Sequence, residues 1–372
     1  MDKNANRPEW ETVFSSDFTE ARSKFLHAAR MANAKQLEGF NHPLNGPEGE
    51  LLACDVALFG SRTAKNMIIT ISGLHGVEGW AGAACQLAWC RDHQSVTLPD
   101  DVAILHIHAI NPWGMAWDRR QQEDNIDLNR HFVDFNNLPD NSEYAAYVDA
   151  VMCPDTDQAA RKAANEKLAD FLKQAGRKHY GMVLQGGQYQ YPEAPSFGGT
   201  EPSWSYHCLK QILQTYCKKA ERIVVCDFHT GYGPYGYGIP LWHLEGGAQL
   251  DKAKYLFGPS LEAPLGSEGA EDEFIQHGHL YGHIIAQLPD RDVIPMCFEF
   301  GGATLRAGQR ALLERADALM WRDRNPLEPE SREARKIWRE IHVPDRSDWR
   351  EMVWSRGRQV LRELTERITE IV

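Results

Sequence analysis

Residues 75–78, His-Gly-Val-Glu, place an imidazole and a carboxylate three positions apart in a glycine-rich turn. Both groups are good zinc donors, and a catalytic zinc ion usually takes three protein ligands together with one water molecule. This short segment would supply two ligands, and its glycines allow the backbone to turn sharply beside the ion. The third ligand must come from elsewhere, and His229, which follows the apolar run RIVVCDF, is the best candidate. The pattern therefore indicates a zinc site made of His75, Glu78 and His229.

A carboxylate that could carry a proton lies at Glu299, within the apolar run VIPMCFEFGG. Carboxylates in such runs are rarely buried without a partner, so a purely structural role would require a nearby cation. Zinc can lower the pKa of a bound water to about 7. Glu299 could take the proton from that water and pass it to a leaving nitrogen. An arginine acting with the metal would stabilise the developing oxyanion, and together these residue types indicate hydrolysis of an amide bond.

Other interpretations of these residues stay open. The segment GLHGVEGWAG could form a phosphate loop at a helix N-terminus, although it lacks the GxGxxG spacing and the GK[ST] ending. His106 and His108 alternate within one apolar run and share a face, so a core or supporting role is as reasonable as metal ligation. His277, His279 and His283 have the spacing of a metal cluster, but they follow an acidic segment that we expect to be exposed.

The candidate residues have one property in common, which is that each lies at the end of an apolar run typical of a buried strand. NMIITIS precedes His75, VAILHIHAI precedes Asn111, RIVVCDF precedes His229, and Glu299 lies in a fourth such run. Ligands of open α/β sheets bind at the carboxyl ends of the strands. Segments far apart in the sequence can therefore converge on one site.

Helical runs alternate with these strands. Helical spacing or composition marks residues 16–34, 81–90, 157–175 (ending at Gly176), 203–220 and 358–372, and LLACDVALFG reads as one more strand. This alternation predicts an α/β fold with a central mixed, mostly parallel sheet and helices on both faces.

The chain is expected to form a single catalytic domain. It would comprise residues 1–372, with an N-terminal helical segment over about 1–45 and a C-terminal helical segment over about 330–372. Two long segments rich in Gly and Pro, 181–204 and 256–275, are expected to form lids or pocket walls.

The composition restricts the class of protein. With 42% hydrophobic residues the chain can build a sizeable core, and its net charge of −12 repels nucleic acids and anionic membranes. It lacks an uninterrupted apolar run of about 18 residues, so no membrane span is expected, and its polar N-terminus lacks the core of a signal peptide. Its eight cysteines form no CxxC pair, which favours reduced, buried thiols in a cytoplasmic protein.

Several motifs taken together resemble the zinc carboxypeptidase superfamily, and within it an uncharacterised bacterial branch. They are HGVEG, NPWGMAWDRRQQEDNIDLNRHF and DFHTG, followed by a glutamate on a late strand, and the resemblance covers residues 50–305. It implies one zinc ion per chain, bound by His75, Glu78 and His229, with Glu299 as general base.

The resemblance also implies roles for other residues. Asn129 and Arg130 would bind a substrate carboxylate, and either Arg119 or Arg120 would polarise the scissile carbonyl, with the spacing slightly favouring Arg120. Tyr281 is the candidate for the superfamily's catalytic-site tyrosine.

The sequence departs from the superfamily's pattern at two positions. His131 stands where the superfamily usually has Asn, and Gln122 stands where an Asn is frequent. These departures leave the metal ligands unchanged and affect the substrate pocket.

The resemblance implies a zinc metallohydrolase that cleaves an amide bond in a short peptide or amino-acid conjugate carrying a carboxylate. One alternative keeps the metal but removes an acyl group from an amino acid, as aspartoacylase and succinylglutamate desuccinylase do. A second alternative is a non-catalytic zinc- or peptide-binding protein. The presence of all three ligands and of Glu299 argues against the second alternative.

Overall fold

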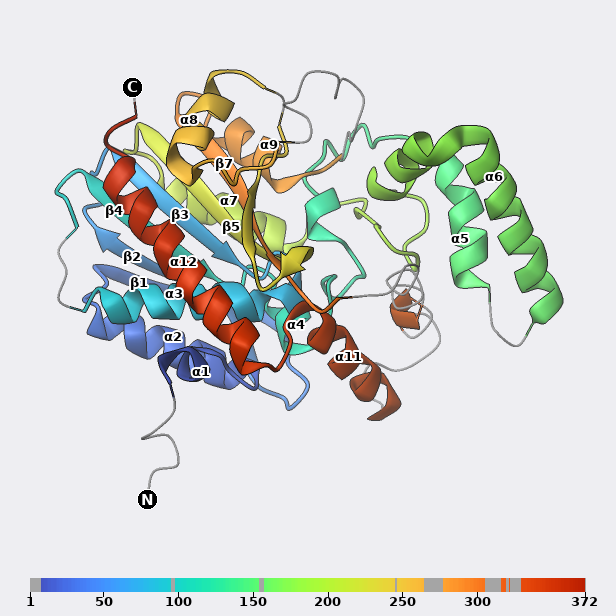
Figure 1. The fold of residues 1–372 in the computed structure, drawn as a ribbon, viewed down its shortest axis with the longest axis horizontal. Coiled ribbons are helices and arrows are strands. Elements are labelled where there is room, and N and C mark those ends of the chain that lie inside the picture. Colours follow the sequence, from blue (N-terminus) through green and yellow to red (C-terminus); the bar gives the residue numbers. More distant parts are fainter. Residues whose placement is uncertain are drawn as a thin grey trace.

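Seven strands form one mixed β-sheet through the centre of the molecule (Figure 1). The computed structural model describes residues 8–94, 98–153, 157–244, 246–263, 277–304, 316–318, 321 and 329–371. The strands are β1 (Gln36–Asn45), β2 (Leu51–Gly60), β3 (Asn66–Ser72), β4 (Val102–His108), β5 (Arg222–Tyr235), β6 (Gly238–Leu241) and β7 (Asp292–Gly301).

The four central strands are parallel. The order across the sheet is β1-β2-β4-β3-β5-β7-β6, with β4, β3, β5 and β7 parallel to one another and the outer strands antiparallel to their neighbours. The central strands are almost continuously apolar because helices cover both of their faces. The predicted fold class, an α/β fold with a mixed and mostly parallel sheet, is confirmed.

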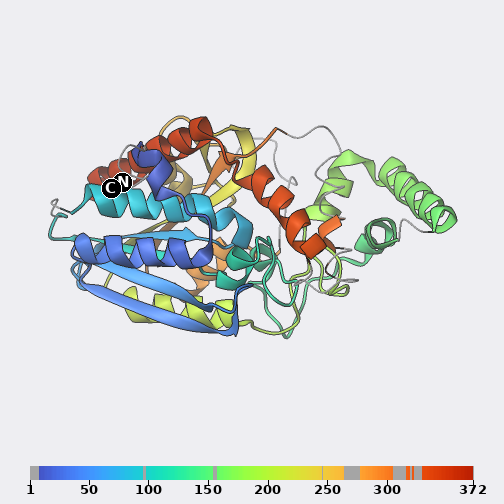
Figure 2. The same cartoon turned by 90° about the horizontal axis from the view of Figure 1, so that it is seen from below.

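Helices cover the two faces of the sheet (Figure 2). One face packs against α1 (Glu9–Val13), α2 (Phe18–Met31), α3 (Gly79–Asp92), α8 (Ala248–Phe257) and α12 (Ser347–Arg367). The other face packs against α7 (Trp204–Tyr216) and α9 (Leu280–Gln287). The described helices do not combine the length and apolar character needed to cross a membrane.

Helix α3 begins directly after the candidate ligand Glu78 and is buried along most of its length. Its small residues allow it to approach the sheet closely. A Cβ atom at Gly82 would lie 2.7 Å from Cβ of Ser72 on β3 and 2.9 Å from Cβ of Phe228 on β5. The first turn of α3 is thus held against both strands, which fixes Glu78 relative to His229.

A helical arm projects from the sheet (Figure 1, green). It consists of α5 (Ala145–Met152) and α6 (Gln158–Gln185). Gly176 interrupts α6 with φ 79° and ψ 163°, so the first helical stretch ends where the sequence predicts. A second stretch continues to Gln185, and the predicted loop 181–204 is therefore helical in its first residues.

The ends of the chain differ in detail from the expectation. The predicted N-terminal helical segment contains α1 and α2 but continues into strand β1. The C-terminal segment contains α11 (Pro329–His342) and α12. Within the predicted loop 256–275, α8 extends to Phe257, and residues 264–275 lie outside the described residues.

Candidate metal centre

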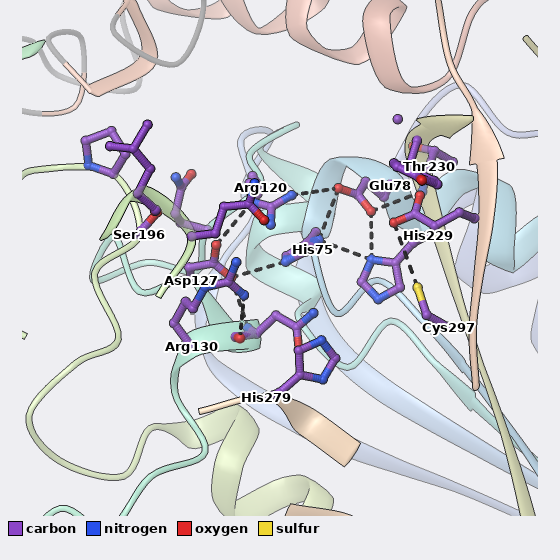
Figure 3. Close-up of a pocket in the computed structure, with 18 of the residues that line it drawn as sticks. His75, Glu78, Arg120, Asp127, Arg130, Ser196, His229, Thr230, His279 and Cys297 are labelled. Atoms are coloured by element: carbon purple, nitrogen blue, oxygen red, sulfur yellow. Dashed lines mark hydrogen bonds and ion pairs between the residues drawn. The ribbon is translucent and has the colours of Figure 1, made fainter. Parts of the chain in front are cut away.

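His75, Glu78 and His229 converge in one buried group (Figure 3). His229 Nδ1 lies 3.2 Å from His75 Nδ1 and 2.9 Å from Glu78 Oε2, and His75 Nδ1 lies 3.1 Å from Glu78 Oε1. All three side chains are at most 4% exposed. Two imidazole nitrogens and a carboxylate are thus directed at one point, as the sequence predicts.

The turn that carries two of these residues depends on Gly76. A Cβ atom at this position would lie only 2.0 Å from the backbone carbon of Gly114. The turn is also bound to the arginine segment, because the N–H groups of Gly76 and Val77 donate to the carbonyl oxygens of Arg120 (3.1 Å) and Arg119 (2.8 Å). Only glycine permits this contact, which places the arginines next to the candidate ligands.

Two aspartates hold the outer nitrogens of the histidines. His75 Nε2 lies 3.1 Å from Asp127 Oδ1, and His229 Nε2 lies 2.7 Å from Asp227 Oδ2. Carboxylates placed in this way fix the ring orientation and tautomer of metal-binding histidines and raise their basicity. The proton of each ring is therefore expected on Nε2, which leaves the Nδ1 lone pair directed at the centre.

The donor set fits a divalent cation. Two lone pairs and a carboxylate at these distances repel one another unless positive charge lies between them. Burial opposes protonation of His229, but the carboxylates of Asp227 and Glu78 outweigh it and raise the pKa of His229 well above its usual value. For Glu78 the effects have the opposite sign. Burial alone would raise the pKa of Glu78, but His75 and His229 hold it well below its ordinary value. The centre thus favours a cation, and two histidines with a carboxylate are a zinc ligand set.

The Asp227→Asn variant should bind zinc about 10- to 100-fold more weakly, because an amide accepts the His229 N–H less strongly than a carboxylate does. Competition against a chromogenic chelator would measure this affinity. Asp292→Asn is a matched control, since Asp292 binds Arg222 and Lys252 at the opposite ends of the strands. Equal affinity in Asp227→Asn and wild type would contradict the supporting role of Asp227.

Glu299 lies beside the centre on the neighbouring strand. It pairs in register with His229 across β5 and β7. Its Oε1 lies 3.8 Å from the Cys297 thiol, and its Oε2 has no hydrogen-bond partner among the described residues. Burial raises the pKa of Glu299, and this outweighs the opposing effect of His229. A carboxylate with a raised pKa and a free oxygen can take up a proton and return it.

Arg120, and not Arg119, points into the pocket. Arg120 donates to Glu78 Oε1 (3.1 Å) and to Asp127 Oδ2 (3.2 Å). Arg119 points away and is bound by Asp317 (2.7 Å) and Asn125 (2.9 Å). The two adjacent side chains are therefore separated by their partners, and only Arg120 can reach a group bound at the centre.

Asn129 and Arg130 line the same pocket. The Arg130 side chain is 6% exposed, and its one hydrogen bond within the described part of the chain runs from Nη1 to the carbonyl oxygen of Asn129 (2.7 Å). Within those same residues it forms no ion pair, and burial lowers its pKa. Burial of a guanidinium that lacks a direct ion pair is costly, and the nearby charge of Asp127 offsets only part of this effect on its pKa. The site therefore favours a bound anion.

Tyr281 lies beneath the centre. It is fully buried, and its hydroxyl group is 3.4 Å from Asp227 Oδ2. It does not line the pocket. The structure thus places Tyr281 behind His229, where it contacts the aspartate that orients this histidine.

The remaining histidines singled out in the sequence are dispersed. His106 and His108 contact Thr70 and Gln86 in the core, away from the pocket. His131 spans two backbone groups, with Nδ1 2.6 Å from the Gly198 carbonyl oxygen and Nε2 accepting from the Ser203 N–H (3.0 Å). Its role is therefore to fix the 186–203 loop.

The 277–283 histidine cluster does not assemble. His279 lines the pocket, whereas His283 packs against Phe132 and Tyr206. Across the described residues, no group of metal donors includes either of them.

The pocket has a volume of about 620 Å³ and contains groups that the sequence does not reveal. They come from helices, from strand β5 and from the segment after β6, and all but one lie outside any recognisable motif: Tyr144, Tyr147, Tyr180, Thr230, His243 and Trp338. Thr230 also contributes its backbone N–H to Glu78 Oε2 at 3.1 Å. A weak signal was present for Thr230, because it lies in the DFHTG motif.

Solved structures similar to this chain include metallo-carboxypeptidases and a desuccinylase. Bovine thrombin-activatable fibrinolysis inhibitor, in complex with tick carboxypeptidase inhibitor, is 13% identical with a TM-score of 0.48, over 96% of this chain and 98% of that chain. A metallo-carboxypeptidase from Burkholderia cenocepacia is 11% identical with a TM-score of 0.44, over 94% and 69%. Succinylglutamate desuccinylase from Chromobacterium violaceum is 13% identical with a TM-score of 0.36, over 87% and 74%.

Likenesses at these identities and TM-scores say nothing of what this chain acts on. No curated protein matches the chain. One family model, described as "Protein of unknown function (DUF2817)", matches residues 14–356. Because this match spans most of the chain, the protein belongs to the DUF2817 family.

Proposed function

We propose that this protein is a zinc-dependent hydrolase that cleaves an amide bond in a short peptide or amino-acid conjugate carrying a free carboxylate. One observation carries the proposal: a buried His-Glu-His donor set and a buried guanidinium without an ion pair within the described residues line the same pocket. The first is suited to a metal and the second to a carboxylate. A substrate that bridges them would place an adjacent amide at the metal.

His75, Glu78 and His229 would hold one zinc ion. Zinc supplies Lewis acidity, which polarises a carbonyl group and acidifies water. Glu299 would act as the general base, taking the proton of the attacking water on Oε2 and delivering it to the leaving nitrogen. Its raised pKa suits both halves of this transfer.

Arg120 would stabilise charge on the carbonyl oxygen. Its guanidinium contacts Glu78 and Asp127, and so it is held at the edge of the centre. A fixed cation at this place lowers the energy of a developing oxyanion without further reorganisation. Asn129 and Arg130 would bind the carboxylate, because the planar guanidinium can donate two parallel hydrogen bonds to it.

The size of the pocket agrees with a small substrate. A volume of about 620 Å³ lies within the range of sites for small molecules. Both a dipeptide and an acyl-amino acid would fit this description. A screen of dipeptides and N-acyl-amino acids with zinc-loaded protein would separate peptidase from deacylase activity. Failure to hydrolyse either class with the metal bound would overturn the proposal.

The Arg130→Lys variant should bind carboxylate-bearing substrates about 10- to 100-fold more weakly, because lysine cannot form the paired hydrogen bonds of a guanidinium. Substrates whose carboxylate is replaced by a primary amide should be affected much less. The measurement is KM for each acid and its amide with wild type and variant. An equal loss for acid and amide would show that Arg130 supports the fold instead of binding the carboxylate.

A further inference from the structure

Two histidines outside the metal ligands line the pocket. His279 immediately precedes α9, and His243 follows β6. In Figure 3, His279 lies between Arg130 and His229. The charges of Arg130, His229 and His75 all act on His279, and those of His229 and Arg130 act on His243. Both imidazoles therefore border the region between the metal centre and the carboxylate site.

The described surroundings of His279 leave its hydrogen-bonding groups without partners. Both ring nitrogens of His279 are shielded from solvent without a hydrogen-bond partner among the described residues. His243 packs beside His279, with its ring centroid 4.7 Å from that of His279 and 6.0 Å from that of Tyr281. A buried polar group without a partner costs about 1–3 kcal/mol, and natural proteins retain few of them. A ligand group that completes these hydrogen bonds would explain their presence.

The two imidazoles are neutral and held in place. Burial, with a contribution from the nearby positive groups, lowers the pKa of His243 to about 3 and that of His279 well below its usual value. A neutral imidazole offers one N–H donor and one acceptor. Tyr281 packs against His279 with ring centroids 4.6 Å apart, so the rings are oriented before any ligand arrives.

The position of these two rings indicates which part of a bound substrate they would contact. In the proposed function, the scissile amide lies at the metal and the substrate carboxylate lies at Arg130. The side chain of the residue that carries this carboxylate then extends from the region that His243 and His279 border. We propose that His243 and His279 recognise a hydrogen-bond-accepting side chain, a carboxylate or carboxamide, on that residue. The positive charge of Arg130 favours the carboxylate further.

This inference rests on the proposed function for the orientation of the substrate, but binding tests it without turnover. Isothermal calorimetry with the zinc-loaded protein would compare free L-glutamate, L-glutamine and L-norvaline, which have the same side-chain length. Aspartate, asparagine and 2-aminobutyrate form the same series one carbon shorter. In at least one series, the acid or amide should bind about 10- to 100-fold more tightly than the apolar member, as expected for one or two hydrogen bonds.

Variants of the two histidines test whether their rings cause the tighter binding of the acid or amide. His279→Phe and His243→Phe should lose most of the preference and bind the apolar amino acids as wild type does. His279→Gln, which keeps an N–H donor, should retain part of it. His283→Phe is the matched control, because it makes the same change within α9 at a side chain that packs against Phe132 and Tyr206. This control should keep the full preference.

Nuclear magnetic resonance provides an independent measurement. The ring nitrogen signals of His279 should shift with the tighter-binding acid or amide and stay unchanged with its apolar counterpart. Equal affinities within both series in wild type, or a preference that survives in both Phe variants, would overturn the inference. Amide hydrolysis with equal affinities would overturn this inference alone, and binding preferences without hydrolysis would overturn the proposed function alone.

Discussion

The Glu299→Gln variant should hydrolyse its substrate on the order of 10²–10⁴ times more slowly than wild type, the usual contribution of a positioned proton-transfer group. Glutamine has nearly the same size and shape, so zinc content and thermal stability should remain close to wild type. The wild-type rate should also fall as the pH decreases through the raised pKa of Glu299, because only the ionised carboxylate accepts a proton. In the variant this acid limb should weaken or vanish.

Two results would contradict this role for Glu299. Loss of zinc from Glu299→Gln would make this residue a ligand, and undiminished turnover would assign the base to another carboxylate. Metal analysis and pH–rate profiles on the same preparations separate the two. Glu38→Gln is a suitable control, because Glu38 accepts a hydrogen bond from Tyr216 and neither residue lines the pocket.

The His75→Ala variant should lose both the metal and the activity. Wild type purified without added metal should contain about one equivalent of zinc, and the variant close to none. Because zinc would contribute several kcal/mol to the transition state, the rate should fall by more than about 10³-fold. Zinc should raise the melting temperature of wild type, since a ligand that binds the native state stabilises it, and should leave that of the variant unchanged.

The matched control for this experiment is His283→Ala, which removes another buried imidazole outside the pocket. It should retain one equivalent of zinc. Full zinc occupancy in His75→Ala would show that His75 is not a zinc ligand, whatever the activity of the variant.

The candidate ligands could be predicted because their signals are local. His75 and Glu78 share one short turn, and His229 directly follows the apolar half of strand β5. The central strands were predictable for the same reason, because burial on both faces imposes a continuous apolar run. Strands β1 and β6 were missed: β1 is an edge strand with mostly exposed or half-buried residues, and β6 has four residues that include a proline.

The pocket beyond the ligands could not be predicted, because it depends on contacts distant in sequence. The choice between Arg119 and Arg120 is one example, since Arg119 is drawn away by Asp317, 198 positions further along the chain. His243 is another, because it comes from a loop without a motif and meets His279 only after folding. Such contacts leave no periodic trace in the sequence around either partner.

The pairing of β5 with β7 has a consequence for the quality of a refolded sample. His229 lies opposite Glu299 and Asp227 opposite Cys297, whereas Phe228 and Phe298 point to the other face. A slip of one residue in this pairing would turn the base away and present an aromatic ring in its place. Such a molecule would keep its helices and much of its core, so its circular dichroism spectrum would resemble that of the native protein. Specific activity per bound zinc would then measure the fraction of chains with the correct strand alignment.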